Sequence, residues 1–450
     1  MKSFEQIAAE LQGYDPQALS ADAVNSFLAQ MVEPVQRTEV LPLFEAFERV
    51  LATDVVSPVS VPPHDNSAMD GYVFDGAQLQ PDQPLTLQPV GGTAFAGKAW
   101  QGEVGKGQCV KIMTGAIMPA GLNTVVPQEL VQTTAGGTIT IAPGLLALGD
   151  NRRFMGEDLM QGHPALRQGQ RLTPAALGLV ASLGLPTVTV YRRLRVAYFS
   201  TGDEILSLGD APREGAVFDS NRYTVFGLLK RLGCEVLDLG VVGDDPAQLE
   251  ATFRRAANEA DAIITSGGVS VGEADHTKSM MKKLAGDDPA SGGGVAFWRI
   301  AMRPGRPMAV GRIPKTGPTA SLSEQVSYQN ELKTAVLFGL PGNPVAVMVT
   351  FLAFVRPALQ RMMGCNAPPP VLLKARSTQT LRKKPGRTEY QRGSVTTRPD
   401  GSLWVDVAGN QGSGVLRSMV EANGLIVLHH HQNSVAEGDE VDVMVFDGVV

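Results

Sequence analysis

Three loops of this 450-residue chain combine glycine, small hydroxyl residues and carboxylates directly after short apolar stretches. They are FSTGDEI at 199–205, SGGVSVGEADHT at 266–277 and LFGLPGNPVAV at 337–347. The apolar stretches are typical of buried strands. In a parallel α/β sheet, the loops that follow the strands meet at one edge, where such folds bind their ligands. We therefore expect the three loops to form one site.

The residue types in these loops predict an oxyanion bound together with a metal ion. Gly267, Gly268 and Gly342 allow the backbone to approach an anion and to direct N–H groups at it. Carboxylates in the same loops would repel that anion unless a hard cation such as Mg²⁺ lay between them. These carboxylates are Asp203, Glu204, Glu273 and Asp275.

Basic residues close to the loops could bind the anion directly. The run WRIAMRPGRP places Arg299, Arg303 and Arg306 around a Pro-Gly turn. Their guanidinium groups can each bind phosphate or carboxylate through two parallel hydrogen bonds. Lys278 follows Asp275 and adds a further positive charge.

Two of the loops also have purely structural interpretations. TGDE at 201–204 could be the N-cap of a helix, and LPGNP at 340–344 could be a rigid turn before one, because Pro is favoured in a first helical turn. The loop at 266–277 is harder to explain in this way, since its glycines and carboxylates make a poor turn but a good ligand loop.

Composition sets wider limits. Hydrophobic residues make up 43% and charged residues 19% of the chain, and the net charge of −6 gives no general attraction to nucleic acid. The three cysteines are far apart and show no CxxC spacing, which argues against a zinc site or a disulfide framework and fits a reducing cytoplasm. The N-terminus lacks the apolar core of a signal peptide, and the longest apolar run, 345–355, is too short for a bilayer. We expect a cytoplasmic protein that binds neither nucleic acid nor membrane.

Other familiar catalytic patterns receive little support. The consecutive histidines 429–431 would point to alternate faces of a strand, so they cannot easily share one metal ion. No Ser-His-Asp or Cys-His pairing can be argued, and the GxxxxGK[ST] loop of nucleotide triphosphatases is absent from the sequence.

Changes of pattern divide the chain into four predicted domains. Helix-type spacing in 1–61, together with 149–190, predicts a discontinuous α-rich domain. The intervening 62–148 reads as a small all-β domain, because short β-branched pieces alternate with Gly and Pro. Strands and helices alternate over 191–366, which predicts a doubly wound parallel α/β sheet. After a Pro-rich hinge, 367–450 predicts a C-terminal β-barrel or sandwich.

Two polar stretches, 286–294 and 313–333, lie between predicted strands without clear periodicity. We interpret both as loops and assign no function to them.

Five motifs in order along nearly the whole chain resemble the molybdopterin molybdenumtransferase family, which includes the E domain of gephyrin. They are DNSAMDGY at 65–72, MTGA at 113–116, TGDE, SGGVSVGEAD and LPGNP. Several separate motifs in one order are far more specific than a single glycine-rich loop.

The resemblance implies the last step of molybdenum cofactor synthesis and a sheet domain of the molybdopterin-binding type. The substrate would be adenylylated molybdopterin, a pterin dithiolene joined to AMP through a pyrophosphate. Molybdate would be inserted at the dithiolene sulfurs, and AMP would leave. The resemblance also implies a homodimer in which the small β domain of one subunit reaches the sheet crevice of its partner.

Site residues follow from the same resemblance. The functional acids would be Asp70, Asp158, Glu204, Asp245 and Asp275, with Thr114; Glu204, Asp245 and Asp275 would hold Mg²⁺. Without the resemblance, Asp70 and Asp158 would be read as turn residues or ion-pair partners. Substrate binding would involve Thr201, Gly202, Asp203, Ser266, Gly267, Gly268, Ser270, Lys278, Arg306, Pro341, Gly342, Asn343 and Pro344.

Arg299 and Arg303 would bind molybdate or the terminal phosphate. Many relatives carry Lys at these positions, so here a planar guanidinium replaces a compact ammonium group.

Two alternatives stay open. The sheet domain alone resembles the molybdopterin adenylyltransferase, which makes the adenylylated intermediate from ATP and could be a partner; the flanking β domains and the motifs at 65–72 and 113–116 argue against this identity. A non-catalytic scaffold, like gephyrin in receptor clustering, is less favoured because the chain has no long disordered linker or second fused domain.

Overall fold

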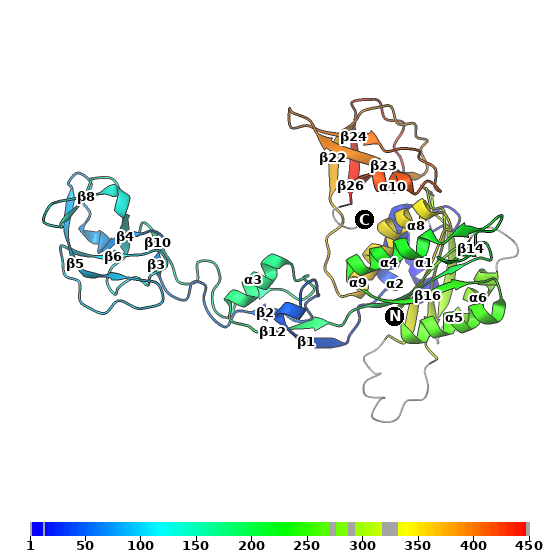
Figure 1. Ribbon diagram of the computed structural model, residues 1–450, viewed down its shortest axis with the longest axis horizontal. Coiled ribbons are helices and arrows are strands. Elements are labelled where there is room, and N and C mark those ends of the chain that lie inside the picture. The colour runs from blue at the N-terminus through cyan, green and yellow to red at the C-terminus, as the bar shows by residue number, and fades with distance from the viewer. Residues whose placement is uncertain (1, 12–13, 270–275, 287–292, 317–331, 447–450) are drawn as a thin grey trace, which may run out of the picture.

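The computed structural model describes residues 2–11, 14–269, 276–286, 293–316 and 332–446. Most of the two polar stretches that the sequence predicts as loops therefore lies outside the described residues. The molecule is elongated, with a small β-sheet at one end and an α/β layer and a β-barrel at the other (Figure 1).

A six-stranded sheet forms the centre of the α/β layer, in the order β16-β13-β17-β21-β20-β18. Its strands are β13 (Arg195–Thr201), β16 (Glu235–Val242), β17 (Ala262–Ser266), β18 (Gly294–Arg299), β20 (Pro307–Pro314) and β21 (Thr334–Leu340). The first four strands in this order run parallel, whereas β20 is antiparallel to both of its neighbours. The wholly parallel sheet of the prediction is thus a mixed one, because the short segment 300–306 joins β18 to β20 directly and such hairpin connections make antiparallel pairs.

Helices cover both faces of this sheet, as its strand sequences require. Successive strand residues point to opposite faces, so Tyr198 of β13 lies in one core and Phe199 in the other. The first core contains α4 (Ser220–Leu232) and the C-terminal helix of the layer, and the second contains α5 (Pro246–Glu259) and α6 (His276–Ala285). Buried on both faces, the strands carry the continuous apolar runs seen in the sequence.

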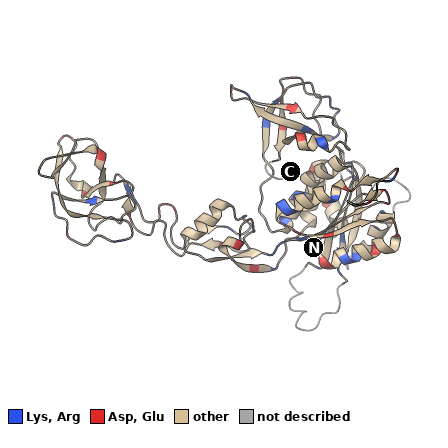
Figure 2. Ribbon diagram, viewed as in Figure 1, with Lys and Arg blue, Asp and Glu red and all other residues tan. Residues whose placement is uncertain are grey.

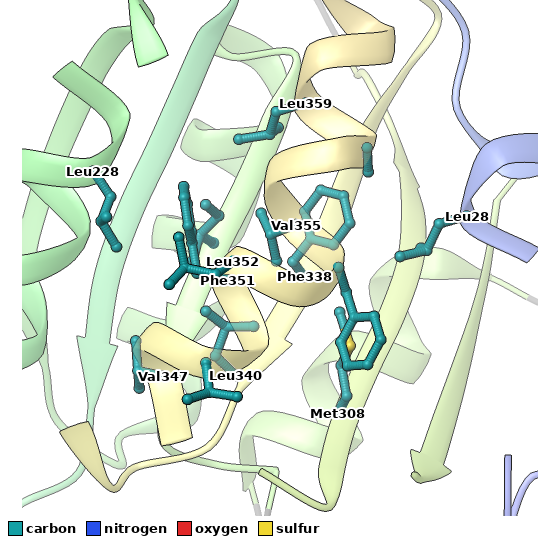
Figure 3. Close-up of a cluster of buried hydrophobic side chains, with 14 of the residues drawn as sticks. Leu28, Leu228, Met308, Phe338, Leu340, Val347, Phe351, Leu352, Val355 and Leu359 are labelled. Atoms are coloured by element: carbon teal, nitrogen blue, oxygen red, sulfur yellow. The ribbon is translucent and has the colours of Figure 1, made fainter. Parts of the chain in front are cut away.

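The C-terminal helix of the layer consists of α8 (Pro344–Thr350), a π-helical turn η5 (Phe351–Val355) and α9 (Arg356–Met362). Side chains along it, such as Phe351 and Leu359, point into the apolar cluster around Phe338 of β21 (Figure 3). Among the described residues this is the one helix long and apolar enough to cross a membrane, with a mean hydropathy of 1.4 over Pro344–Met362, but 72% of it is buried inside the fold. Its apolar sequence is explained by packing against the sheet.

Two N-terminal helices, α1 (Phe4–Glu10) and α2 (Ala21–Met31), pack on the same face of the sheet. The ring of Phe27 meets the indole of Trp298 edge to face, with centroids 4.9 Å apart. The buried Arg312 of β20 donates hydrogen bonds to the carbonyls of Lys2 and Met31. The N-terminus is therefore fixed to the α/β layer.

The chain then leaves the layer and later returns beside itself. Strand β1 (Thr38–Pro42) pairs with β12 (Thr187–Tyr191), and β2 (Val55–Val56) pairs with β11 (Pro164–Leu166). Helix α3 (Pro174–Ser182) packs over them, with Thr173 as its N-cap. These segments, with the turn η1 (Leu43–Glu45), form the connection to the small β-sheet.

The small sheet has the order β7-β4-β6-β5-β9-β8. Its elements are β4 (Gly71–Phe74), η2 (Gly76–Gln78), β5 (Leu85–Ala94), β6 (Gln108–Ile112), β7 (Thr124–Pro127), η3 (Gln128–Leu130), β8 (Val131–Thr133) and β9 (Ile139–Ile141). A short ladder between β3 (Asn66–Ser67) and β10 (Arg152–Arg153) joins its two connections.

The C-terminal residues form a closed five-stranded barrel, β23-β24-β22-β26-β25, in which β25 pairs back with β23. Its elements are β22 (Leu372–Ser377), β23 (Thr388–Thr397), β24 (Leu403–Val407), α10 (Arg417–Glu421), β25 (Gly424–Leu428) and β26 (Glu440–Val445). Strand β19 (Met302–Arg303), from the α/β layer, pairs with β23. The barrel is thereby attached beside the edge of the central sheet.

Charges of both signs are mixed over these parts (Figure 2). On α5, for example, Glu250 pairs with Arg254, and Arg255 with Glu259, each one helical turn apart. The mixture agrees with the expectation that any anion site must be local.

Candidate functional site

A cleft of about 930 Å³ opens between the ends of β13, β17 and β21 and the neighbouring barrel. All three loops singled out in the sequence contribute to its lining, as the parallel strands require. The predicted residues that line it are Thr201, Glu204, Ser266, Gly267, Gly268, Arg303, Arg306, Pro341, Gly342 and Asn343.

The glycines of the second loop allow a backbone course that no other residue could follow. Gly267 and Gly268 have φ angles of +88° and +62°. A Cβ on Gly267 would lie 2.5 Å from the carbonyl oxygen of Thr201, and one on Gly268 would lie 2.5 Å from the Cβ of Thr277. The loop therefore passes close over the end of β13 and along one wall of the cleft.

Three buried hydroxyl groups lie beneath this loop. The phenol oxygen of Tyr198 is 2.7 Å from Ser266 Oγ and 2.9 Å from Ser200 Oγ, and the two serine oxygens are 3.3 Å apart. Both serines line the cleft. Burial, together with the charges of nearby carboxylates, raises the pKa of Tyr198, so its hydroxyl stays protonated at neutral pH.

The start of helix α4 forms another part of the lining. Asp219 caps the helix by accepting a hydrogen bond from the N–H of Arg222, and Asn221 donates a hydrogen bond of 2.7 Å to the carbonyl of Gly342. Both line the cleft and are at least nine-tenths buried. Neither residue was predicted from the sequence, because Asp219 as the N-cap and Asn221 in the first turn form an ordinary pattern at the start of a helix.

Arginine side chains add positive charge to the lining of the cleft. Arg303 and Arg306 line the cleft from the segment between β18 and β20, and Arg387 joins them from the barrel, where it forms a 2.7 Å ion pair with Glu389. Arg299 is exposed at the end of β18 and does not line the cleft.

A barrel loop at 411–413 closes this side of the site. Asn343 donates a hydrogen bond of 3.0 Å to Ser413 Oγ, and the N–H of Val345 donates one of 3.1 Å to the Ser413 carbonyl. The buried Arg392 holds the loop by donating to the carbonyls of Asn410 and Gly412. Burial lowers the pKa of Arg392 to about 10, so the group still carries its charge at neutral pH. Sequence patterns give no signal for these contacts, because only the fold brings the barrel to the sheet edge.

Several predicted site residues lie outside the cleft lining. Asp245 caps α5 by accepting a 2.8 Å hydrogen bond from Gln248 N–H. Asp203 accepts one of 3.0 Å from Asp244 N–H, and Lys278 lies over the Phe297 ring on the other face of the sheet. Gly202 and Pro344 shape the loop after β13 and the start of α8. Ser270 and Asp275 lie outside the described residues.

The structure gives no support to a preformed metal cage. Over the described part of the chain, no group of three His, Cys, Asp or Glu residues is placed to hold a metal ion. In the histidine run, Nε2 of His429 lies 2.7 Å from a carboxylate oxygen of Asp442.

The remaining predicted acids belong to the distant part of the molecule. Asp70, just before β4, accepts two hydrogen bonds of 2.7 Å from the hydroxyl and the N–H of Thr114. These bonds lower the pKa of Asp70, so the carboxylate is ionised at neutral pH. Asp158 is exposed, and its N–H donates to the Val61 carbonyl. Strand β4 lies at the opposite end of the molecule from the central sheet (Figure 1), so the chain does not bring Asp70 to its own cleft.

Comparisons with known proteins cover nearly the whole chain. Three family models match in order: the MoeA N-terminal region (domain I and II) at 19–184, a probable molybdopterin binding domain at 197–361 and the MoeA C-terminal region (domain IV) at 374–446. The chain is 41% identical to a molybdopterin molybdenumtransferase of Haemophilus influenzae over 94% of its length and 98% of the relative's. It is 33% identical to one of Nostoc over 96% and 95% of the two chains.

A solved structure is similar over the same extent. The crystal structure of a molybdopterin biosynthesis moeA protein from Pyrococcus horikoshii matches with a TM-score of 0.73 at 25% identity, covering 95% of this chain and 100% of that one. This likeness confirms the predicted multidomain α/β architecture with a C-terminal barrel.

Proposed function

The chain belongs to the molybdopterin molybdenumtransferase family, and from this premise we propose that it is a transferase that inserts molybdenum into molybdopterin during synthesis of the molybdenum cofactor. The single observation that carries the proposal is the cleft, whose lining combines the three predicted loops with arginine side chains. A volume of about 930 Å³ is at the upper end of the range for small-molecule sites and suits a large substrate.

The substrate we propose is adenylylated molybdopterin, with molybdate as the second substrate and AMP as the leaving product. A pyrophosphate carries negative charge, and molybdate is an oxyanion. The lining of the cleft offers both of them Arg303, Arg306 and the glycine loop that begins at Ser266. Guanidinium groups stabilise charge that develops on a leaving phosphate, because they are in place before the reaction begins.

The residues of the cleft could hold a magnesium ion only if most of its ligands were oxygen atoms of the substrate. Glu204 is a carboxylate in the cleft lining, and Mg²⁺ usually takes one or two carboxylates together with phosphates and water. We propose Glu204 as one ligand, with Asp245 and Asp275 as the further acids that the family resemblance implies. When bound, Mg²⁺ would neutralise charge on the pyrophosphate.

We further propose a homodimer in which Asp70, Thr114 and Asp158 act at the partner's cleft. The exposed apolar side chains support a second copy as partner. Phe44 is fully exposed at 100%, Val40 of β1 is 66% exposed and Phe154 is 53% exposed. Of these, Val40 and Phe44 belong to the consecutive elements β1 and η1, and an exposed apolar patch marks interaction sites in soluble proteins. The reaction would take place in the cytoplasm, in keeping with the three free cysteines.

A turnover assay tests the proposal. Purified protein receives adenylylated molybdopterin, molybdate and Mg²⁺, and AMP release is followed. We expect release that requires both molybdate and Mg²⁺ and that is lost in Glu204→Gln and Asp275→Ala. Val420→Thr, on the exposed face of α10, is the matched control.

Other outcomes would contradict the proposal in distinct ways. If ATP and molybdopterin instead yield the adenylylated form, the chain is an adenylyltransferase. If neither reaction occurs while the ligand still binds, the chain is a binding scaffold.

A further inference from the structure

The buried hydroxyl cluster beneath the cleft points to a residue that none of the sequence motifs includes. We propose that Tyr198 is a positioning residue that holds the hydroxyl of Ser266 as a hydrogen-bond donor to an oxyanion in the cleft. The inference rests on the proposed function, which supplies two oxyanions, the substrate pyrophosphate and molybdate.

The cluster follows from strand geometry. Tyr198 and Ser200 are two residues apart on β13, so their side chains lie on the same face of the sheet. Ser266 of β17 is the register partner of Ser200, which places it on that face too. The long phenol side chain thus reaches both serine oxygens from below.

One hydroxyl proton of the cluster is not used in the two short contacts. Each of the three hydroxyls has one proton to donate and can also accept. Both short contacts, 2.7 Å and 2.9 Å, involve the Tyr198 oxygen, which can donate only one of them and must accept the other. The serine that accepts from Tyr198 therefore keeps its own proton for another partner.

Ser266 is the serine we assign to that role. It has the shorter contact with Tyr198, and it begins the loop of Gly267 and Gly268 along the cleft wall. Its alternative partner, Ser200, is 3.3 Å away, which is long for a bond between hydroxyls. A hydrogen bond to an anion is roughly twice as strong as one between neutral groups, so a bound oxyanion takes the proton of Ser266.

Burial makes Tyr198 a dependable donor. The side chain is 1% exposed and its ring packs in the apolar core, and this burial raises the pKa of the phenol, so that it stays protonated. A hydroxyl that accepts a hydrogen bond becomes a better donor itself, which strengthens the contact of Ser266 with the ligand.

The test measures anion affinity directly, by calorimetry with AMP in the presence of Mg²⁺ and separately with molybdate. In Tyr198→Phe the ring remains and only the hydroxyl is lost, and the two serines can then bond to each other. We expect affinity for one of the two anions to fall about 10-fold, the equivalent of about 1.4 kcal/mol, because the charge-assisted hydrogen bond of Ser266 is weakened. Which anion responds identifies the oxyanion that Ser266 contacts.

A double-variant cycle separates positioning from general damage. Ser266→Ala should lose at least as much affinity as Tyr198→Phe, and the double variant should lose no more than Ser266→Ala alone, because Tyr198 acts only through Ser266. Ser200→Ala should have a smaller effect. Tyr390→Phe, which alters another buried tyrosine away from the cleft, should leave both affinities unchanged.

Three results would overturn the inference. They are unchanged affinity for both anions in Tyr198→Phe, additive losses in the double variant, or a loss in Tyr198→Phe that is matched by a comparable fall in its unfolding midpoint. Because the readout is binding, it can succeed even if the wild-type protein releases no AMP, so failure of the proposed function would be seen separately.

Discussion

At the scale of single residues, Asp245 shows how a structural and a chemical role can occupy the same side chain. Its carboxylate caps α5 and does not line the cleft, yet the family resemblance makes it a candidate acid for Mg²⁺. Asn caps helices about as well as Asp but carries no charge. The substitution Asp245→Asn can therefore separate the two roles.

We expect Asp245→Asn to change the free energy of unfolding by less than about 0.5 kcal/mol, because the cap is kept. If Asp245 also acts on the metal, the Mg²⁺ concentration for half-maximal AMP release should rise about 10-fold, the equivalent of about 1.4 kcal/mol. If this Mg²⁺ concentration is unchanged in the variant, capping of α5 is the only role of Asp245.

A buried ion pair between Arg192 and Asp261 makes a second prediction at this scale. Two hydrogen bonds of 2.7 Å and 2.8 Å join the groups, and the Arg195 N–H adds a third contact to Asp261. Burial by itself would raise the pKa of Asp261, but the hydrogen bonds and charge of Arg192 outweigh it and hold this pKa below its usual 3.8. A carboxyl whose pKa is lower in the folded state stabilises the fold above the unfolded-state pKa, and this contribution disappears as the pH falls through the folded-state pKa.

We expect Asp261→Asn to cost about 3–5 kcal/mol at pH 7, since it leaves a buried guanidinium without its counterion. The difference from the wild type should shrink as the pH falls below the unfolded-state pKa of about 4, because the unfolded wild type then binds a proton that the folded state takes up only at a lower pH. Denaturant unfolding at a series of pH values measures both effects. A difference that stays constant down to pH 2 would contradict the ionised pair.

At the scale of elements, the loop after β17 depends on its glycine backbone. A Cβ on Gly268 would meet Thr277, and the φ of +62° is unfavourable for other residues. We expect Gly268→Ala to cost about 1–3 kcal/mol in unfolding free energy and to weaken anion binding. Gly342→Ala is the control for stability, because no atom lies within 4 Å of a Cβ built there. Equal stability of the two variants would argue against a strained loop.

Sequence patterns could predict that the three loops line one cleft, because the order of strand and then loop determines it. Ser266, Gly267 and Gly342 follow apolar strands, and parallel strands bring such loops to one edge. The patterns could not predict Arg387 and Ser413, because these residues reach the cleft only through packing of the barrel beside β19. Nor could they show that β20 runs antiparallel, since the apolar pattern of a buried strand carries no direction.

Asp219 and Asn221 were missed for a different reason. Asp219 is the N-cap of α4 and Asn221 lies in its first turn, which helix capping fully explains, so nothing in the sequence distinguishes a cap inside a cleft from one on the surface. Tyr198 was likewise hidden, because a tyrosine in an apolar strand is typical of core packing.

At the scale of the whole molecule, the proposed dimer predicts a dependence on Phe44. Its side chain is 100% exposed beside β1, so in a monomer a charge there should be harmless. If a second copy covers this face, Phe44→Glu should bury a charge and shift the protein to monomers with loss of activity. Val420→Glu, at an 83% exposed position of α10, is the control and should remain dimeric. Sedimentation analysis measures whether each variant is a monomer or a dimer. If the Phe44→Glu variant is still a dimer, the face around Phe44 is not the dimer interface.

The distance between β4 and the central sheet has a genetic consequence. Suppose that Asp70→Ala and Glu204→Ala are each inactive as pure proteins. In a mixed dimer, one cleft receives the altered Glu204 and the altered Asp70 together, whereas the other cleft is built from two unaltered contributions. When the Asp70→Ala and Glu204→Ala variants are expressed in one cell, they should therefore complement each other and restore activity. Asp219→Ala and Glu204→Ala, both lesions of the same cleft wall, should fail to do so.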